Sequence, residues 1–274
     1  MCAAEVTPGA TALRLVPGLE AGAPPLRLER LAGGSVNDSW RVDTAQGRFV
    51  LRVDGPAWRR PGVDRAREQG LHAAAAGAGL APRLLARAAG IQVCEYLEGR
   101  IWSEADFLQP AQLFRLGARL AQLHALEAAG EIGHFDPGGC AQQYVQLMSS
   151  ELVAATGAGA VAAEVRAAAQ QVADGTAGEC IIHGDLAHSN LLDGTRLWLL
   201  DWEYAQLADP LYDVACVLAY YPETRAQARR LLNAAGLAGF GQPGRLDAAI
   251  RVYEGLSWLW HQARRAAAAA VAMP

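Results

Sequence analysis

The sequence contains no lysine, so all 24 of its basic residues are arginines. The formal net charge of −4 and the pI of about 5.9 do not indicate a nucleic-acid partner. The five cysteines are scattered, without a C-x-x-C pair or metal-ligand spacing. This usage predicts reduced thiols in a cytoplasmic protein, and it gives no sign of a disulfide framework or a zinc site.

Long hydrophobic runs are also missing from the 274 residues. The N-terminal residues, MCAAEVTP, lack the basic and apolar regions of a signal peptide. The alanine run at 267–270 is short and is preceded by two arginines, so it predicts the end of a helix rather than a membrane span. We therefore expect no membrane association, and no feature indicates an obligate protein partner. Because 52% of the residues are hydrophobic and 19% are charged, the chain can still bury a sizeable core.

The first third of the chain has the alternating pattern of β-strands. Arg41 and Asp43 alternate with Trp40 and Val42, which is the period of a half-buried strand. Similar runs predict strands at residues 26–31, 39–43, 48–53, 83–88 and 91–97, with a turn at 44–47 and a helix at 63–77. These elements predict a five-stranded antiparallel sheet with one helix. The segment before them, rich in proline and glycine, is expected to be loose over residues 1–25.

From residue 110 onward, composition and spacing favour helices. We expect helices at 111–126, 142–155, 161–173, 211–220, 224–235 and 245–270, and surface loops at 157–159 and 174–178. Short strands within residues 180–201 interrupt them. The sequence therefore predicts an α+β chain with a small antiparallel β lobe, residues 26–98, and a larger, mainly helical lobe, residues 99–274.

Residues 183–190 read HGDLAHSN, and a second aspartate, Asp201, follows the apolar residues of a predicted strand. An H-x-D-x-x-x-x-N loop with a second Asp at this distance supplies what phosphoryl transfer from ATP requires. We predict that Asp185 meets the acceptor hydroxyl, either as general base or as the carboxylate that positions it. Asn190 and Asp201 are predicted to hold Mg²⁺, which prefers hard oxygen ligands. His183 is predicted to pin the loop backbone rather than to shuttle protons.

Arg52 ends the strand-like run FVLR and occupies the place where a kinase normally has lysine. An arginine can bind phosphate through two hydrogen bonds and does not deprotonate. Glu68, on the following helix, is the predicted partner that would fix the guanidinium. A surface arginine and a solvated glutamate remain open as alternatives.

Two adjacent glycines, Gly33 and Gly34, lie between predicted strands and precede Ser35 and Asn37. Paired glycines let the backbone approach phosphate oxygens closely. We therefore predict that Gly34, Ser35 and Asn37 contact the nucleotide phosphates. An ordinary turn would use the same pair of glycines.

Taken in order over residues 26–265, these segments resemble the aminoglycoside phosphotransferase and choline kinase superfamily. The resemblance includes VCEYLEG at 93–99, LDWEY at 200–204 and DPLYD at 209–213. The last two segments, with arginine at position 52, are most similar to bacterial choline kinases and thiamine kinases. The resemblance implies a protein-kinase-like bilobal fold, with ATP and Mg²⁺ as cofactors.

The resemblance also implies roles for individual residues. Residues 93–96 would form the hinge whose backbone meets adenine, so Cys94, Glu95 and Tyr96 are expected at the nucleotide. Asp213 matches a buried aspartate that supports the catalytic loop.

For the acceptor, choline kinases hold a quaternary ammonium group with a carboxylate and aromatic faces. Cation–π attraction contributes roughly 1–2 kcal/mol per desolvated contact. Glu203 matches the carboxylate, and Tyr212, Trp258 and Trp260 are candidate walls. Residues two apart do not share a helix face, so at most one of Trp258 and Trp260 is expected to line the pocket.

The leading hypothesis is an ATP-dependent small-molecule kinase that acts on an alcohol, with choline, ethanolamine, thiamine or an amino sugar as acceptor. A catalytically silent nucleotide-binding protein is the alternative outside enzymes, although Asp185, Asn190 and Asp201 are all present. A protein kinase is disfavoured, because the short spacing from Asp201 to Asp213 and the lack of an A-P-E motif leave no room for an activation loop.

Overall fold

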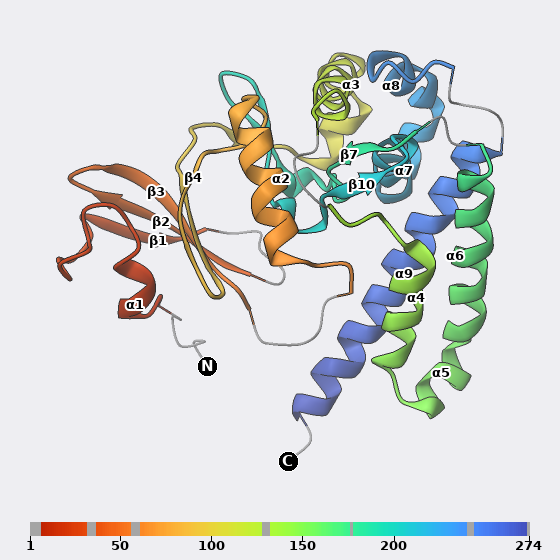
Figure 1. Cartoon of the computed structure of the whole chain (residues 1–274), viewed down its shortest axis with the longest axis horizontal. Coiled ribbons are helices and arrows are strands. Elements are labelled where there is room, and N and C mark those ends of the chain that lie inside the picture. The colour runs from red at the N-terminus through yellow and green to blue at the C-terminus, as the bar shows by residue number, and fades with distance from the viewer. Residues whose placement is uncertain are drawn as a thin grey trace.

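A five-stranded antiparallel sheet forms one end of the molecule (Figure 1). The computed structural model describes residues 7–31, 37–55, 61–127, 132–175, 178–239 and 244–272. The strands are β1 (Arg27–Arg30), β2 (Asp38–Thr44), β3 (Gly47–Val53), β4 (Leu84–Ala88) and β5 (Ile91–Glu95), in the spatial order β1-β2-β3-β5-β4. The predicted antiparallel sheet is confirmed, and β3, which carries Arg52, lies at its centre.

One face of the sheet is covered by the N-terminal segment. Trp40, Val42, Phe49 and Leu51 form a cluster there with Ala12, Val16, Leu19 and Val93. The short helix α1 (Ala10–Leu13) belongs to this segment, and Thr44 Oγ1 donates a hydrogen bond to the Pro17 carbonyl at 2.9 Å. The expectation of a loose segment is therefore wrong for this part, because its few apolar side chains are spaced to pack against the sheet.

Helix α2 (Arg65–Gly77) crosses from the sheet to the helical part of the molecule (Figure 1). Asp64 caps it by accepting hydrogen bonds from the backbone N–H groups of Ala66 and Arg67. Its buried residues Leu71 and Ala75 belong to the large core of the helical part rather than to the cluster on the sheet. The helix therefore brings Arg65 and Glu68 to the boundary between the two parts.

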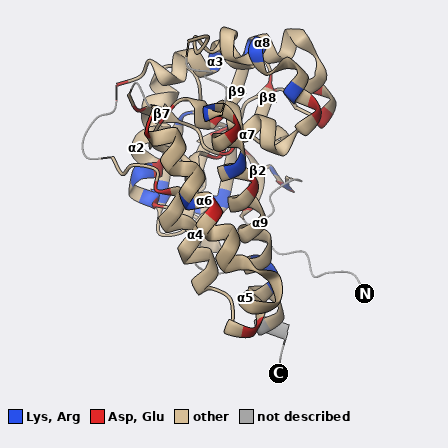
Figure 2. Cartoon of the chain, turned by 90° about the vertical axis from the view of Figure 1, so that its right-hand side faces the viewer, with Lys and Arg blue, Asp and Glu red and all other residues tan. Residues whose placement is uncertain are grey.

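Helices make up most of the remaining chain. They are α3 (Pro110–His124), α4 (Pro137–Gln146), α5 (Ser150–Thr156), α6 (Ala158–Ala173), α7 (Leu211–Tyr220), α8 (Ala228–Ala234) and α9 (Arg245–Ala272). Four 3-10 turns accompany them, η1 (Glu104–Leu108), η2 (His188–Asn190), η3 (Trp202–Tyr204) and η4 (Pro222–Gln227). The long helix α9 packs against α4, α6 and α7. Figure 2 shows few charged positions on the end of the molecule formed by α4, α5 and the nearby part of α6.

Three predicted helical features differ from the structure. The helix expected at 142–155 is divided into α4 and α5, because Ser149 caps a new helix by accepting from the Leu152 N–H. The loop expected at 157–159 is a single left-handed residue, Gly157, at which α5 and α6 meet with a bend of 69°. The helix expected at 224–235 begins as the 3-10 turn Pro222–Gln227.

No single helix among the described residues is long and apolar enough to cross a bilayer, and only the bent pair α5 and α6 reaches the required length and composition together.

Short strands flank the segment that contains the HGDLAHSN loop and Asp201. β7 (Cys180–Ile182) pairs with β10 (Gln206–Ala208), and the hairpin β8 (Leu191–Asp193) and β9 (Leu197–Leu199) pairs with β6 (Arg100–Ile101). The HGDLAHSN loop joins β7 to β8, and Asp201 directly follows this hairpin. Both ends of the motif are thus fixed by paired strands.

Close packing between α3 and α8 generates a testable prediction. A Cβ added at Gly117 of α3 would lie 2.4 Å from the Ala234 Cβ and 3.0 Å from backbone atoms of α8. We expect Gly117→Ala to lower the free energy of unfolding by about 1–3 kcal/mol, as overpacking does. Urea unfolding measures this change.

The matched control is Gly70→Ala in α2, where an added Cβ meets nothing within 4 Å. Alanine is a better helix former than glycine, so this variant should gain roughly 0.5–1 kcal/mol. A gain of similar size in Gly117→Ala would contradict the close approach of α3 and α8.

Candidate active site

A single buried carboxylate holds the start of the HGDLAHSN loop. Asp213, in the first turn of α7, is fully buried. Its oxygens accept hydrogen bonds from the backbone N–H of His183 at 3.1 Å and of Gly184 at 2.9 Å. His124 of α3 contacts Asp213 Oδ2 through Nε2 at 3.0 Å. Asp213 therefore makes the contacts with the loop that its predicted supporting role requires.

The His183 ring is part of the same support. Burial lowers the pKa of this imidazole, so the neutral ring is favoured. Nε2 lies 2.9 Å from the Leu200 carbonyl and Nδ1 accepts from the Asp185 N–H at 3.3 Å. Because a carbonyl can only accept, Nε2 carries the hydrogen. The ring thus ties the loop to the residue before Asp201, which leaves neither nitrogen for proton shuttling.

Two backbone conformations shape the site. Gly184 has φ 78°, and a Cβ there would lie 2.7 Å from the Tyr204 carbonyl oxygen, so only glycine fits. Asp201 has φ 59°, and it is the one non-glycine residue with positive φ in the described part of the chain. Aspartate tolerates this region better than most residues, but the conformation is sparsely populated.

Asp185 lies among polar partners at the centre of the loop. Asn190 Nδ2 donates to both the backbone carbonyl and Oδ2 of Asp185 at 2.9 Å, and the Tyr220 hydroxyl donates to Oδ1 at 3.2 Å. Burial, together with the negative charges of Asp201 and Glu203, raises the pKa of the Asp185 carboxyl to about 7. A carboxyl held in this way is suited to accept a proton from a substrate.

The donor set next to Asp185 fits a magnesium ion. Asn190 uses its Nδ2 for Asp185, and its amide oxygen, which accepts a long hydrogen bond from Ser189 Oγ at 3.4 Å, is the atom of this side chain that can coordinate a cation. No cluster of three or more His, Cys, Asp or Glu side chains able to hold a metal exists within the described ranges. Mg²⁺ in nucleotide sites needs only one or two protein ligands beside phosphates and water. An amide oxygen and the Asp201 carboxylate are such a pair.

Arg52 lies opposite these residues on the central strand of the sheet. Its Nη2 pairs with Glu68 Oε1 at 2.5 Å, and its Nη1 pairs with Asp201 Oδ1 at 2.8 Å. Burial alone would lower the pKa of Arg52, but Asp201, Glu68 and Glu203 together raise it. The predicted pairing with Glu68 is present, and Arg52 also reaches the proposed metal ligand.

Glu203 is buried beside Asp201, with 4% of its surface exposed. Its Oε2 accepts hydrogen bonds from Arg65 Nη1 at 3.1 Å and from Asn37 Nδ2 at 3.2 Å. Asn37, predicted at the phosphates, therefore points toward Glu203. The Glu203 carboxylate already has a cationic partner within the protein.

A cleft of about 1140 Å³ joins these groups. One side is lined by the predicted hinge residues Cys94, Glu95 and Tyr96. The Tyr96 N–H is bonded to the Arg48 carbonyl at 3.0 Å, and burial raises the pKa of the Cys94 thiol to about 11. The described residues of the site that line this cleft are Asn37, Arg52, Asp185, Asn190, Asp201 and Glu203.

The other side of the cleft is aromatic. Side chains from η3, α4, α7, α9 and the segment before α4 line it, namely Phe135, Tyr144, Tyr204, Tyr220, Tyr253 and Trp260. The Tyr253 hydroxyl donates to the Gly184 carbonyl at 3.2 Å, which fixes this wall to the catalytic loop. Within this group, the Tyr220 hydroxyl contacts Asp185, and the Arg264 guanidinium lies over the Trp260 ring at 5.0 Å from its centroid.

The sequence matches the model of the phosphotransferase enzyme family over residues 27–249. The chain belongs to this phosphotransferase family. A comparison with the curated proteins gives no match.

Solved structures similar to this phosphotransferase include two choline-type kinases. A choline/ethanolamine kinase family protein from Mesorhizobium loti is 26% identical, with TM-score 0.72, and the match covers 96% of this chain and 87% of that chain. A choline kinase from Streptococcus pneumoniae is 21% identical, with TM-score 0.71 and coverage of 90% and 88%, and it has also been solved with AMP. A macrolide 2'-phosphotransferase from Brachybacterium faecium is 22% identical, with TM-score 0.61 and coverage of 94% and 97%. These likenesses support the kinase-like fold expected from the sequence.

Two predicted wall residues of the phosphotransferase do not line the cleft in the described structure. Tyr212 lies in the buried first turn of α7, where its ring packs edge-on against Phe135 with centroids 4.9 Å apart. Trp258 and Trp260, two residues apart on α9, both pack partly against the core, and of this pair, of which at most one was expected at the pocket, Trp260 lines the cleft. The assignment of Tyr212 as a wall residue is corrected, because it is absent from the lining of the cleft. Gly34 and Ser35 lie outside the described residues.

Three contributors to the site of the phosphotransferase were not predicted. Tyr220 follows Asp213 by two helical turns of α7, so its contact with the loop was readable from helical spacing. Arg65 precedes Glu68 by three residues, which is also a same-face spacing. His124 gave no signal, because its partner Asp213 lies 89 residues away in sequence.

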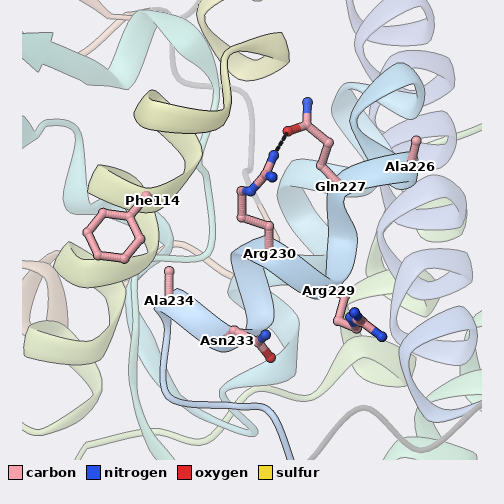
Figure 3. Close-up of a pocket in the computed structure, with 7 residues that line it drawn as sticks. All are labelled: Phe114, Ala226, Gln227, Arg229, Arg230, Asn233 and Ala234. Atoms are coloured by element: carbon pink, nitrogen blue, oxygen red, sulfur yellow. Dashed lines mark hydrogen bonds between the residues drawn. The ribbon is translucent and has the colours of Figure 1, made fainter.

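A second pocket lies between α3 and α8, outside the cleft (Figure 3). Its volume is about 460 Å³, and its lining residues are Phe114, Ala226, Gln227, Arg229, Arg230, Asn233 and Ala234. The Arg230 guanidinium donates a hydrogen bond to Gln227 Oε1 at 2.7 Å. None of the lining residues is acidic. The pocket therefore has no carboxylate that could hold a metal ion or accept a proton.

The support of the catalytic loop by Asp213 can be tested through stability. Asp213→Asn replaces an acceptor oxygen by a donor amide, which leaves a buried N–H of His183 or Gly184 without its partner. We expect the free energy of unfolding to fall by about 2–4 kcal/mol. His124→Ala leaves both loop N–H groups bonded, so its loss should be smaller, about 1 kcal/mol.

Urea unfolding measures both variants, and hydrogen exchange of the peptide that contains residues 183–190 reports on the loop. Faster exchange in Asp213→Asn than in His124→Ala is expected. Equal stability and equal exchange in the two variants would show that the loop does not depend on this carboxylate.

Proposed function

We propose that the protein transfers the γ-phosphoryl group of ATP to a hydroxyl of a small alcohol. The observation that carries this proposal is the convergence of Asp185, Asn190, Asp201 and Arg52 in one cleft. The family match supports phosphotransfer, and the AMP complex of a similar choline kinase supports an adenine nucleotide as donor. We also propose that residues 26–98 act as the ATP-binding lobe and residues 99–274 as the catalytic lobe.

In the proposed reaction, each group of the site has one task. Mg²⁺ held by Asn190 and Asp201 would offset the phosphate charge. Arg52, fixed by Glu68, binds phosphate oxygens. Asp185 orients the acceptor hydroxyl and takes its proton. The acceptor oxygen forms a bond to the γ-phosphorus while the bond to the β-bridging oxygen breaks, so ADP and a phosphate monoester result.

The acceptor we propose is a cationic alcohol of the choline type. Trp260, Tyr253 and the other aromatic side chains on one side of Asp185 support this choice, because π faces attract quaternary ammonium groups. Glu203 remains a proposed contact of the acceptor, although Arg65 already pairs with it. Thiamine and amino sugars are alternatives, and the similar macrolide phosphotransferase shows that this fold is also used with larger acceptors.

A catalytically silent nucleotide-binding protein is the alternative outside enzymes, and a complete set of Asp185, Asn190 and Asp201 argues against it. Because the proposed reaction consumes ATP and requires Mg²⁺ as a cofactor, we propose the cytoplasm as its location. No nucleic acid, membrane or protein partner is part of the proposal.

Substitution of Asp185 should impair turnover alone, whereas substitution of Asp201 should also impair nucleotide binding. Asp185→Ala removes the group that meets the hydroxyl, so kcat should fall by about 10²–10⁴-fold. The dissociation constant of the Asp185→Ala variant for the non-hydrolysable analogue AMP-PNP with Mg²⁺ should stay close to that of the wild type. Asp201→Ala removes a metal ligand and should weaken that binding as well. Steady-state kinetics and calorimetry make the comparison, and near-wild-type kcat in Asp185→Ala would exclude the assigned role.

The charge of the acceptor can be tested with an isosteric pair. Choline and 3,3-dimethyl-1-butanol have the same shape, but only choline is charged. If aromatic faces bind the cation, choline should have a KM lower by about tenfold or more, given roughly 1–2 kcal/mol per desolvated contact. Trp260→Leu should reduce this difference.

Tyr212→Leu is the matched control, because Tyr212 is an aromatic residue outside the cleft lining of the described structure. Similar KM values for the two alcohols would make an uncharged acceptor, such as a sugar, the better assignment.

A further inference from the structure

One arginine at the start of α2 contacts three carboxylates from three separate elements. Arg65 Nη1 donates to Glu68 Oε2 at 2.8 Å and to Glu203 Oε2 at 3.1 Å. The other edge of the guanidinium faces Asp54, with Nε to Oδ2 at 3.0 Å and Nη2 to Oδ1 at 2.7 Å. Asp54 follows β3, Glu68 belongs to α2, and Glu203 lies in η3. Arg65 therefore joins the end of the sheet, the helix and the segment after Asp201.

These contacts close a ring with those of Arg52. Arg52 pairs with Glu68 at 2.5 Å and with Asp201 at 2.8 Å, while Arg65 pairs with Glu68 at 2.8 Å and with Glu203 at 3.1 Å. The backbone from Asp201 to Glu203 completes the circuit. Each oxygen of Glu68 thus has one guanidinium at hydrogen-bonding distance, and Arg87 Nη2 lies farther from Oε2, at 3.9 Å. A displacement of any one member changes the partners of its neighbours.

The charges explain why the ring needs Arg65. Glu68 and Glu203 are 1% and 4% exposed, and buried carboxylates are costly unless they are paired. Without Arg65, Glu68 Oε2 would keep only the more distant guanidinium of Arg87, at 3.9 Å, and Glu203 would lose its contact with Arg65. Both carboxylates would then compete for Arg52, which the proposed function needs at the phosphates.

We propose that Arg65 is a positioning residue that sets Arg52 and Asp201 for the nucleotide by holding Glu68 and Glu203 together. The inference rests on the proposed function, because it assumes a nucleotide in this cleft. It gives the charge of Glu203 a role in the alignment of the site, in addition to the proposed contact of the same carboxylate with the acceptor. Arg65 itself touches neither reacting group.

A double-mutant cycle with Arg65→Gln, Glu203→Gln and the combined variant tests the proposal. The primary measurement is the dissociation constant of Mg²⁺ with AMP-PNP by calorimetry, which requires no turnover. Each single variant should weaken binding by between about 5-fold and 150-fold, the usual range of coupling between sites. The combined variant should bind no more weakly than the weaker single variant, because both substitutions break the same ring.

Two further variants separate positioning from charge and from stability. Arg65→Lys keeps the charge but lacks the planar fork, so it should recover only part of the affinity. Arg245→Gln breaks an Arg–carboxylate pair with Asp209 that is at least as buried and lies outside the cleft lining. It should lower the melting temperature without changing the dissociation constant by more than about twofold.

The opposite outcomes are also defined. If Arg65→Gln and Glu203→Gln only lower the melting temperature, as Arg245→Gln does, Arg65 is merely structural and the inference is wrong. If Glu203→Gln raises the KM of the acceptor and leaves AMP-PNP binding unchanged, Glu203 belongs to the acceptor site and the inference is again wrong. If the wild-type protein itself binds no AMP-PNP, the proposed function is wrong, and the inference about Arg65 is wrong with it. This result is distinguishable from the two outcomes above, in which the wild-type protein still binds AMP-PNP.

Discussion

The structure of the site depends on the buried charge of Asp213. Helix α7 is otherwise almost entirely apolar, and a lone carboxylate in such a helix is stable only if it is fully hydrogen-bonded. The loop backbone at His183 and Gly184 and the ring of His124 supply those bonds. The same hydrogen bonds therefore hold the loop in position and satisfy the buried carboxylate of α7.

A second feature is the use of arginine for every positive charge near the cleft. A lysine has one ammonium group, whereas a guanidinium presents donors along two edges. Arg52 and Arg65 each use this geometry to contact carboxylates from different elements. The absence of lysine, which has its simplest origin in the composition of the chain, thus has a consequence for how the site is built.

The sheet and the catalytic loop were predictable from the sequence because both depend on local patterns. Strand alternation placed β2 and β3 to within a residue or two, and the spacing of the motif identified Asp185, Asn190 and Asp201 as neighbours. The pairing of Arg52 with Glu68 followed from the order of the strand and the helix.

The remaining parts depend on contacts that leave no periodic signal. The division of α4 from α5 is decided by a serine cap, which competes with a continuous helical pattern. The wall residues were partly wrong, because the sequence shows that Tyr212 is aromatic but not which way the buried turn of α7 presents it. The pairing of Glu203 with Arg65 joins residues 138 positions apart, so it required the fold.

The arrangement of the core has a mechanical consequence for the sheet. Described core residues fall into two clusters, one on the sheet and one that contains α2 and the helices. The sheet meets α2 through polar pairs, which include Arg52 with Glu68, Asp54 with Arg65 and Gln92 with His72. A displacement along this boundary would leave buried charged and polar groups without partners, whereas separating α6 from α9 would open an apolar cavity. The orientation of the sheet on α2 is therefore set by directional contacts between specific polar partners, whereas the helices hold one another through apolar packing, which has no such direction.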